Sequence, residues 1–326
     1  MKKISIGVTC IGSVIGQGII KSIKASSLSG DCEITGFEYL EDTVGSYWVN
    51  RNYIMPDILK TDVSEEDYME ILLDRIKKHK IQFLFIGMGF ELAMMAAYKD
   101  IIQQETGCTV VVSSSDIIEI ARDKHKTYQF LKDNNLYHPA TWLPDQKHEI
   151  LYPAIIKPRV GTHSRGVSII NDEFQLGKRA SEIRNPMIQE VVGTEQNEYT
   201  CGVLFLDGKT ETQICLQRYL RDGNTSIAYH HSDTPEIIYS YLKEITQKLQ
   251  PFGPCNYQMR LDNDGTPKLF EINARFSGSI FMRTLFGLNE MEYLIKYLLH
   301  LDLPEFNPVF GKVIRYPEEY LATATA

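Results

Sequence analysis

Three polar side chains follow an apolar stretch near residue 270. In the segment LFEINARFSGS (269–279), Glu271, Asn273 and Arg275 are spaced two residues apart. If the strand that contains Leu269 and Phe270 continues through them, all three point to the same side of it. The apolar residues around them indicate burial, and a buried acid needs a partner. A solvated sheet edge is therefore the weaker interpretation.

The turn sequence Asn263-Asp264-Gly265 predicts a hairpin between the strands 255–262 and 267–273. This hairpin brings Gln258 close to Glu271, with Asn273 on the same face. Mg²⁺ takes one or two carboxylates and completes its shell with phosphates and water. The spacing therefore favours a metal site at these three residues, beside an arginine that can neutralise phosphate oxygens.

Other candidate residues are weaker when each is taken alone. Lys157 ends the apolar strand 151–158 and precedes the loop PRVGTHSRG (158–166), which suits a phosphate-covering loop, although an exposed lysine is the plainer interpretation. In IQEVVGTEQNEY (188–199), Glu190 ends a strand, and the backbone around Val192 can face a purine edge. Glu198 follows at a spacing that can reach ribose hydroxyls. The same segment is equally well explained as a strand and an acidic loop.

Substrate recognition has four candidates. Arg218 can orient a carboxylate or an acyl phosphate, although a solvated loop explains it equally well. Ser277 and Ser279 flank Gly278, which permits close backbone approach to an anion. Glu91 follows a strand end, where open α/β sheets bind ligands, and can hold a substrate amine. An acid at a helix N-terminus is the plainer interpretation of Glu91.

Alternating strands and helices predict a Rossmann-like parallel sheet in residues 1–115. The expected strands are 3–10, 33–39, 81–86 and 109–113, and the expected helices are 19–25, 65–80 and 91–104. The glycines of GSVIGQG (12–18) are expected in a turn. Because their spacing differs from GxGxxG, they give little support to a nicotinamide site or to a dehydrogenase.

Residues 116–305 have a different pattern, with more antiparallel signals. A helix is expected at 116–134, a hairpin at 198–205 and 212–219, and further helices at 235–249 and 290–300.

The order of these motifs resembles the ATP-grasp superfamily, most closely its carbamoyl-phosphate-synthase large-subunit-like branch. NYQ (256–258) followed by EINAR (271–275) is similar to the family pattern Q…ExNPR, with Ala274 in place of proline. The resemblance implies an ATP-grasp domain of two α+β subdomains at 116–305, with a nucleotide lid at about 125–192 and a C-terminal tail at 306–326.

The same resemblance assigns roles to the site residues. It implies that Mg²⁺, for which Mn²⁺ can substitute, binds to Gln258, Glu271 and Asn273. ATP is implied to contact the phosphate cations Lys124, Lys157 and Arg275, the adenine hinge at Glu190 and Val192, and Glu198 at the ribose. Lys157 and Arg275 would also disperse charge during catalysis.

The implied function is an ADP-forming carboxylate–amine ligase that activates a small carboxylic acid as an acyl phosphate and couples it to an amine. A carboxyphosphate- or carbamoyl-phosphate-forming enzyme and a non-catalytic ATP-binding regulator are the alternatives. Related enzymes are often homodimers, so a homodimer is a further expectation.

Composition limits the remaining classes. A net charge of −8 argues against broad nucleic-acid binding, which needs a basic face. No apolar run approaches the ~18 residues that cross a bilayer, so no membrane partner is expected. The six cysteines have no zinc-like spacing and are expected as buried thiols of a cytoplasmic protein.

Overall fold

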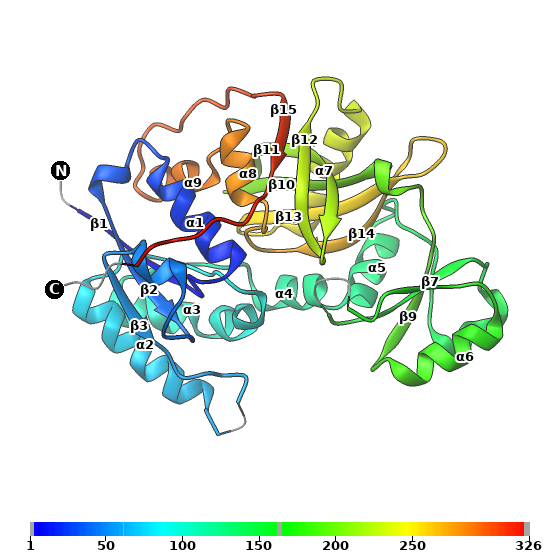
Figure 1. Cartoon of the computed structure of the whole chain (residues 1–326), viewed down its shortest axis with the longest axis horizontal. Helices are drawn as coiled ribbons and strands as arrows, with labels where there is room; N and C mark the ends of the chain where they lie inside the picture. Colours follow the sequence, from blue (N-terminus) through cyan, green and yellow to red (C-terminus); the bar gives the residue numbers. More distant parts are fainter. Residues whose placement is uncertain (1–2, 61, 162–164, 323–326) are drawn as a thin grey trace.

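The computed structural model describes residues 3–60, 62–161 and 165–322, which form three sheets (Figure 1). A parallel sheet lies at one end of the molecule and a small antiparallel sheet at the other. A larger antiparallel sheet lies between them, alongside two short helices. This arrangement confirms the predicted combination of a Rossmann-like sheet and an α+β part.

The N-terminal sheet has five parallel strands in the order β3-β2-β1-β4-β5. They are β1 (Ile4–Thr9), β2 (Cys32–Glu38), β3 (Arg51–Ile54), β4 (Phe83–Phe85) and β5 (Thr109–Val111), and the helices are α1 (Val14–Lys24), α2 (Glu65–His79) and α3 (Leu92–Thr106). Short 3₁₀ turns occur at η1 (Ser29–Asp31), η2 (Val44–Tyr47) and η3 (Gly89–Glu91). Only β3, a four-residue edge strand without a buried residue, was not predicted.

The turn expected at residues 12–18 is wrong, because α1 begins at Val14. The Ser13 hydroxyl caps this helix by accepting a hydrogen bond from the Gly16 N–H at 2.9 Å. A Cβ atom on Gly16 would lie 2.2 Å from the Cys10 carbonyl oxygen, and one on Gly18 would lie 2.4 Å from Ile280. Gly16 and Gly18 therefore allow neighbouring atoms to pack closely against α1. Because packing explains these glycines, they give no support to a dinucleotide site at this position.

The single helix expected at 116–134 is two helices, α4 (Ser115–Arg122) and α5 (Lys124–Asp133). Asp123 lies between them in extended conformation, and its carboxylate accepts from the backbone N–H groups of His125 and Lys126. A carboxylate that caps the N-terminus of α5 in this way favours the start of a new helix over the continuation of α4. The break makes Lys124 the first residue of α5.

The small sheet has four antiparallel strands in the order β6-β9-β7-β8 and is covered by α6 (Glu173–Glu182). Its strands are β6 (Thr141–Trp142), β7 (Ala154–Pro158), β8 (Ser168–Ile170) and β9 (Pro186–Glu190), with a 3₁₀ segment at η4 (Pro144–Glu149). Sequence analysis did not include α6 or β6. A core of its own, with Ile156, Leu176 and Ile188 at its centre, lets this part form a distinct layer.

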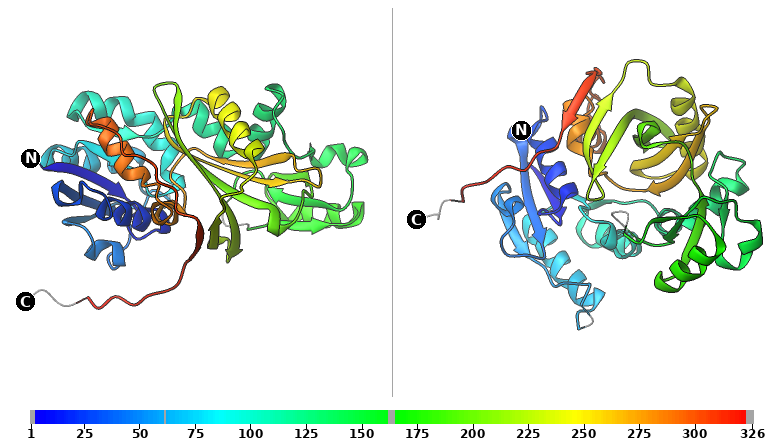
Figure 2. Two further views of the ribbon diagram at one scale, coloured as in Figure 1. Left: turned by 90° about the horizontal axis from the view of Figure 1, so that it is seen from above. Right: turned by 45° about the vertical axis from the view of Figure 1, so that its right-hand side comes forward.

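The central sheet has six antiparallel strands in the order β14-β13-β10-β11-β12-β15, and it curves strongly (Figure 2). The strands are β10 (Glu198–Leu206), β11 (Lys209–Arg221), β12 (Asn224–His230), β13 (Gly253–Leu261), β14 (Pro267–Asn273) and β15 (Gly311–Ile314). The helices are α7 (Glu236–Leu249), α8 (Ile280–Leu285) and α9 (Glu290–Leu298), and η5 (Glu195–Asn197) precedes β10. Both predicted hairpins, β10–β11 and β13–β14, are present.

Residues 306–326, expected as a tail, include β15, which pairs with β12 at the edge of the central sheet. The chain then runs back across α1 toward the N-terminal sheet (Figure 1). There, Tyr320 packs against Tyr47, with ring centroids 5.6 Å apart.

One continuous apolar core joins the N-terminal and central sheets. It extends from Phe37 and Leu84 through α4 to Tyr257 and Leu269. Five of the six free cysteines are buried, as expected. None of the described helices is long and apolar enough to span a membrane.

Candidate nucleotide and metal site

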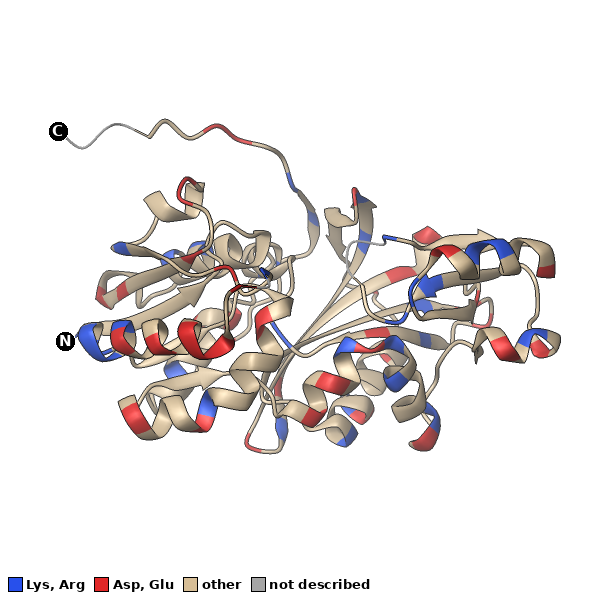
Figure 3. Ribbon diagram, turned by 90° about the horizontal axis from the view of Figure 1, so that it is seen from below, with Lys and Arg blue, Asp and Glu red and all other residues tan. Residues whose placement is uncertain are grey.

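A cavity of about 300 Å³ lies between the small sheet and the central sheet, and we call it the inter-sheet pocket. It contains eight of the predicted site residues: Lys124, Lys157, Glu190, Val192, Glu198, Arg218, Gln258 and Glu271. The rest of its lining is Pro139, Ile155, Pro158, Gly161, Arg165, Val167, Gln189, Glu195, Leu220, Arg260 and Phe270. Basic and acidic residues are mixed on the ribbon in both the left and the right half of the view in Figure 3.

The register of the central sheet brings these side chains together. Gln258 on β13 is directly opposite Glu271 on β14, and Glu198 on β10 is opposite Arg260 on β13. Residues paired across neighbouring strands project from the same face. A hairpin and the neighbouring strand β10 thus place an amide, two acids and a guanidinium along one wall of the pocket.

Glu271 is the carboxylate best suited to a metal. Burial alone would raise its pKa, but the positive charges of Lys124 and Lys157 and a hydrogen bond from Asn273 outweigh burial, and the pKa is lowered. One oxygen, Oε1, accepts from Asn273 Nδ2 at 3.2 Å. Among the described residues no partner contacts Oε2, so this oxygen can ligate a cation.

The two amides of the predicted metal set are already hydrogen-bonded. Asn273 Oδ1 accepts from Arg275 Nη2, and Gln258 Oε1 accepts from Arg218 Nη2, both at 2.8 Å. Within the described part of the chain, no group of three or more His, Cys, Asp or Glu side chains could hold a metal. One ionised carboxylate beside an amide nevertheless fits Mg²⁺, which is commonly held by few protein ligands plus phosphates and water.

Lys157 is 6% exposed, and its Nζ donates to Gln189 Oε1 at 2.7 Å and lies 5.6 Å from the ring centroid of Phe270. Burial and the nearby charge of Lys124 lower its pKa to about 7. Lys124 Nζ donates to the Gly161 carbonyl at 3.1 Å. Lys124 and Lys157 therefore place two positive charges near Glu271. Two such charges can neutralise the oxygens of a bound phosphate.

The loop after β7 is tied to the start of α5. Arg159 donates to both carboxylate oxygens of Asp123, and the Lys124 N–H donates to the Arg159 carbonyl at 2.9 Å. These contacts fix Lys124 relative to the loop. His163 and Ser164 of this loop lie outside the described residues.

The predicted adenine hinge is attached to Ala140, the residue before β6. The Glu190 carboxylate accepts from the Ala140 N–H at 2.9 Å, and the Glu190 N–H donates back to the Ala140 carbonyl at the same distance. Val192 follows in the pocket wall. The backbone of this segment is therefore held in place beside the cavity.

Glu198, assigned to ribose by the resemblance, has its carboxylate held by two arginines. Arg218 Nε donates to Oε1 at 2.8 Å, and Arg218 Nη2 lies 2.7 Å from the same oxygen. Arg260 donates to Oε2 through Nε and Nη2 at 2.8–2.9 Å. The ribose role of Glu198 stays a prediction. Arg260 was missed, although it is two residues after Gln258 on the same strand face.

Five predicted residues lie beyond the pocket lining: Asn273, Arg275, Ser277, Ser279 and Glu91. Arg275 Nη1 donates to the Phe276 carbonyl at 2.7 Å, and a Cβ on Gly89 would lie 3.6 Å from Arg275 Nε, so Arg275 borders the loop after β4. The hydroxyls of Ser277 and Ser279 are 3.0 Å apart. Arg315, which sequence analysis missed, donates to the carbonyl of Gly278 between them.

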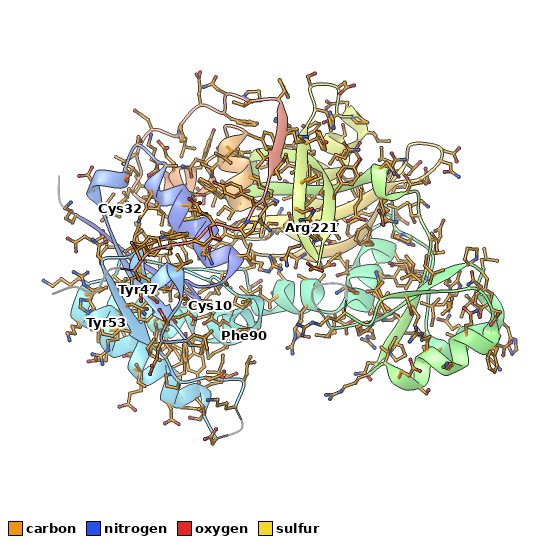
Figure 4. The ribbon with its side chains drawn as sticks, in the orientation of Figure 1. Cys10, Cys32, Tyr47, Tyr53, Phe90 and Arg221 are labelled. Atoms are coloured by element: carbon orange, nitrogen blue, oxygen red, sulfur yellow. The ribbon has the colours of Figure 1, made fainter. Side chains whose placement is uncertain are left out.

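Glu91 does not contact the pocket, and a direct role in binding a substrate amine is not supported. It is 0% exposed, and its carboxylate accepts from the hydroxyls of Thr9, Tyr39 and Tyr68 at 2.5–3.1 Å. Neighbouring Phe90 lies on the side of the N-terminal sheet that faces the middle of the molecule (Figure 4).

Comparisons with known proteins agree with this geometry. Residues 184–318 match a family described as ATP-grasp in the biosynthetic pathway with Ter operon. The arginine-specific carbamoyl phosphate synthase large chain of Schizosaccharomyces pombe is 24% identical over 326 residues, covering 89% of this chain and 28% of the relative. The chain therefore spans less than a third of that relative. The D-aspartate ligase of Enterococcus faecium is 22% identical, covering 79% of this chain and 68% of that protein.

Among solved structures, the L-amino acid ligase of Bacillus licheniformis shares the fold with a TM-score of 0.72 and 16% identity, over 95% of this chain and 78% of that one. The family match and the shared fold confirm the resemblance that the Gln258–Glu271 motif predicted. Residues 184–318 thus match an ATP-grasp family, and the chain is similar in sequence to carbamoyl phosphate synthase large chains.

Proposed function

We propose that this protein is an ADP-forming ligase that joins a small carboxylic acid to an amine, with ATP and Mg²⁺ bound in the inter-sheet pocket. The observation that carries the proposal is the meeting of Glu271, kept ionised, with Lys124 and Lys157 at one wall of a cavity. The relatives named as D-aspartate ligase and L-amino acid ligase support the reaction class.

The chain's residues have separate tasks in this reaction. Lys124 and Lys157 neutralise phosphate oxygens, and Glu271 with Asn273 holds Mg²⁺, for which Mn²⁺ can substitute, with Gln258 as the third candidate ligand. The metal supplies charge neutralisation on the phosphates. The purine edge lies against the segment from Glu190 to Val192, where Glu190 is held by the backbone of Ala140 just before β6.

The first step transfers a phosphoryl group. A carboxylate oxygen of the acid attacks the γ-phosphorus of ATP, the bond to the β-phosphate oxygen breaks, and ADP leaves with its electron pair. The product is an acyl phosphate. Lys157 and Arg275 disperse the charge of the transferring group, which is the main contribution that a protein makes to such a reaction.

The second step forms the C–N bond. The amine nitrogen attacks the acyl carbon, phosphate leaves with the bonding electrons, and the nitrogen loses a proton. The loop from Ser277 to Ser279 is the proposed contact for the acid, because it follows Arg275 directly and Gly278 leaves room for an anion. Exclusion of water protects the acyl phosphate from hydrolysis.

The test is ADP and phosphate release from purified protein with ATP, Mg²⁺ and pools of carboxylic acids and amines. The expected result is ADP formation that needs one acid and one amine together. Release that needs only bicarbonate and ammonia would support the carbamoyl-phosphate alternative. Tight ATP binding without turnover in any pool would instead identify a regulator.

A further inference from the structure

A chain of hydrogen bonds runs from the buried amine of Lys157 into the small sheet. Lys157 Nζ donates to Gln189 Oε1 at 2.7 Å, and Gln189 Nε2 donates to Thr141 Oγ1 at 3.0 Å. The Thr141 hydroxyl in turn donates to the Pro139 carbonyl at 3.0 Å. Gln189 and Thr141 are both buried. We call Pro139, Thr141 and Gln189 the amide relay.

The register of the small sheet builds this relay. Thr141 on β6 is paired with Gln189 on β9, and Gln189 is also paired with Ile155 on β7. Lys157 is two residues after Ile155, so its side chain leaves β7 on the same face as Gln189. Ile155, Lys157 and Gln189 all line the inter-sheet pocket. Three adjacent strands therefore carry the relay to the pocket wall.

The relay also determines which end of the Gln189 amide faces Lys157. A hydroxyl has one proton to donate, and Thr141 gives this proton to the Pro139 carbonyl, which can only accept. Thr141 Oγ1 therefore accepts from Gln189, and the only donor of that side chain is its nitrogen. The amide oxygen is left to face Lys157, where it meets a group that donates.

Gln189 is the neutral partner of Lys157. The charged groups that act on Lys157 are Lys124 on α5, Arg260 on β13 and Glu271 on β14. An amide oxygen accepts from an ammonium without cancelling its charge, whereas a carboxylate would neutralise it. An ammonium has three protons to donate, and Gln189 takes one of them on the side of the small sheet. The other two can then point to an anion in the pocket.

We propose that Gln189 is a positioning residue that holds the Lys157 ammonium at the pocket wall for phosphate, and that Thr141 and Pro139 fix the orientation of the Gln189 amide. The inference rests on the proposed nucleotide site. Side chains that orient a binding group in this way contribute to affinity without touching the ligand through their own charge.

The first part of the experiment needs no nucleotide. Nuclear magnetic resonance of lysines labelled with ¹³C at Cε follows the titration of Lys157, whose signal is identified by its absence in Lys157→Met. Loss of a hydrogen bond to a charged group should lower the Lys157 pKa by about 1 in Gln189→Met. Gln189→Glu, which places a negative charge beside the amine, should raise the pKa. A purely structural role of Gln189 would not produce shifts of opposite sign.

Thr141 variants test the orientation of the amide. Thr141→Val removes the hydroxyl, so the Gln189 nitrogen can turn toward Lys157, and the Lys157 pKa should fall as it does in Gln189→Met. Thr141→Ser keeps the hydroxyl and should recover the wild-type titration. Gln175→Met is the matched control, because Gln175 lies on α6 outside the pocket lining, and it should leave the Lys157 titration unchanged.

The second part measures binding of a non-hydrolysable ATP analogue with Mg²⁺ by calorimetry. The pKa of Lys157 is about 7, so a pKa lower by about 1 leaves much less of the amine charged at pH 7. Gln189→Met should therefore bind the analogue about fivefold more weakly at this pH. When Gln189→Met is added to Lys157→Met, no further loss of affinity is expected, because the two residues act as one unit.

Two results would overturn the inference. One is an unchanged Lys157 pKa in Gln189→Met, and the other is a further loss of affinity when Gln189→Met is added to Lys157→Met. If the wild type binds no analogue, the proposed function is wrong, while the titration still decides whether Gln189 holds Lys157. Thermal melting checks that each variant is folded at the pH of the measurement.

Discussion

Two glutamates, the half-buried Glu271 on β14 and the fully buried Glu91 beyond the end of β4, have opposite environments. Cations surround Glu271, and its pKa is lowered in spite of burial. Burial raises the pKa of Glu91, whose carboxylate receives only hydrogen bonds from hydroxyl and thiol groups. The sequence places both acids at strand ends, yet only one of them lines a cavity.

Glu91 and Glu271 have two different uses for an acid that is removed from solvent. Glu91 connects β1, the segment after β2 and α2 through Thr9, Tyr39 and Tyr68, so its contacts are closed within the N-terminal part of the chain. Glu271 has one oxygen without a described partner and faces positive charge across open space. A buried acid whose acceptors are all satisfied by hydroxyls indicates a structural cross-link, whereas one facing cations and a cavity indicates a ligand site.

The largest effect is expected for Glu271→Gln. Loss of the ligating charge should lower ADP formation by about a thousandfold, on the scale of removing an electrostatic stabiliser of the transition state. The measurement is steady-state ADP release with saturating ATP, Mg²⁺ and the identified substrates. Glu182→Gln, which changes an exposed acid on α6 outside the pocket lining, is the control and should stay near wild type. Wild-type turnover in Glu271→Gln would contradict the metal assignment.

Glu91→Ala should affect stability instead of chemistry. It leaves three buried hydroxyl donors without their acceptor and creates a cavity, so the free energy of unfolding should fall by about 3 kcal/mol. Urea denaturation followed by circular dichroism measures this change.

The pH dependence gives a second readout for Glu91. Because its folded-state pKa is raised, the favourable contribution is present at low pH and is lost as the pH rises through the folded pKa. The stability of Glu91→Gln relative to wild type should therefore increase as the pH rises above the ordinary carboxyl pKa of 4.5. A difference that does not change with pH would mean that the Glu91 carboxyl group has the same pKa in the folded and unfolded states.

Local patterns in the sequence predicted much of the fold. The helix expected at 65–80 is present as α2, with Tyr68, Met69 and Leu72 among its buried residues and Ser64 as its N-cap. The turn at 263–265 gave the β13–β14 hairpin and the pairing of Gln258 with Glu271. These features depend on neighbours in sequence, where spacing and turn chemistry contain the information.

The missed features depend on contacts between distant segments. β6 has two residues and β15 four, and each exists because it pairs with a strand far along the chain. The two arginines that hold Glu198 lie 20 and 62 positions away in the sequence. The local sequence around Glu198 therefore indicated an acid without partners. The glycines of α1 look like turn residues until their contacts with Cys10 and Ile280 are known.

A smaller effect is expected from the titration of Lys157. Because its pKa in the free protein is about 7, the Lys157 amine is mostly neutral above that pH. Phosphate binding favours the charged amine, so binding above pH 7 takes up a proton. Analogue affinity should therefore fall from about pH 7 to about pH 9, by at most about tenfold per pH unit. Calorimetry in buffers of different ionisation enthalpy measures the proton uptake directly. Lys157→Met should bind more weakly at low pH and lose this proton uptake, and equal uptake in both proteins would assign it to another group.

The smallest effect tests the other side of the pocket, where the loop after β7 meets α5. Arg159→Ala removes the ion pair with Asp123 but leaves that carboxylate to cap the helix. The loop carrying Gly161, which accepts from Lys124, should become less ordered and the nucleotide analogue should dissociate a few times faster, consistent with a partly exposed ion pair worth about 1 kcal/mol. Stopped-flow release of a fluorescent analogue measures the rate. Arg179→Ala, which breaks an exposed pair with Glu182 on α6, is the control and should leave the rate unchanged. Equal rates in Arg159→Ala and wild type would mean that backbone contacts alone hold the loop. The positions of Lys157 and Lys124 in the pocket would then be set by the backbones of β7 and α5.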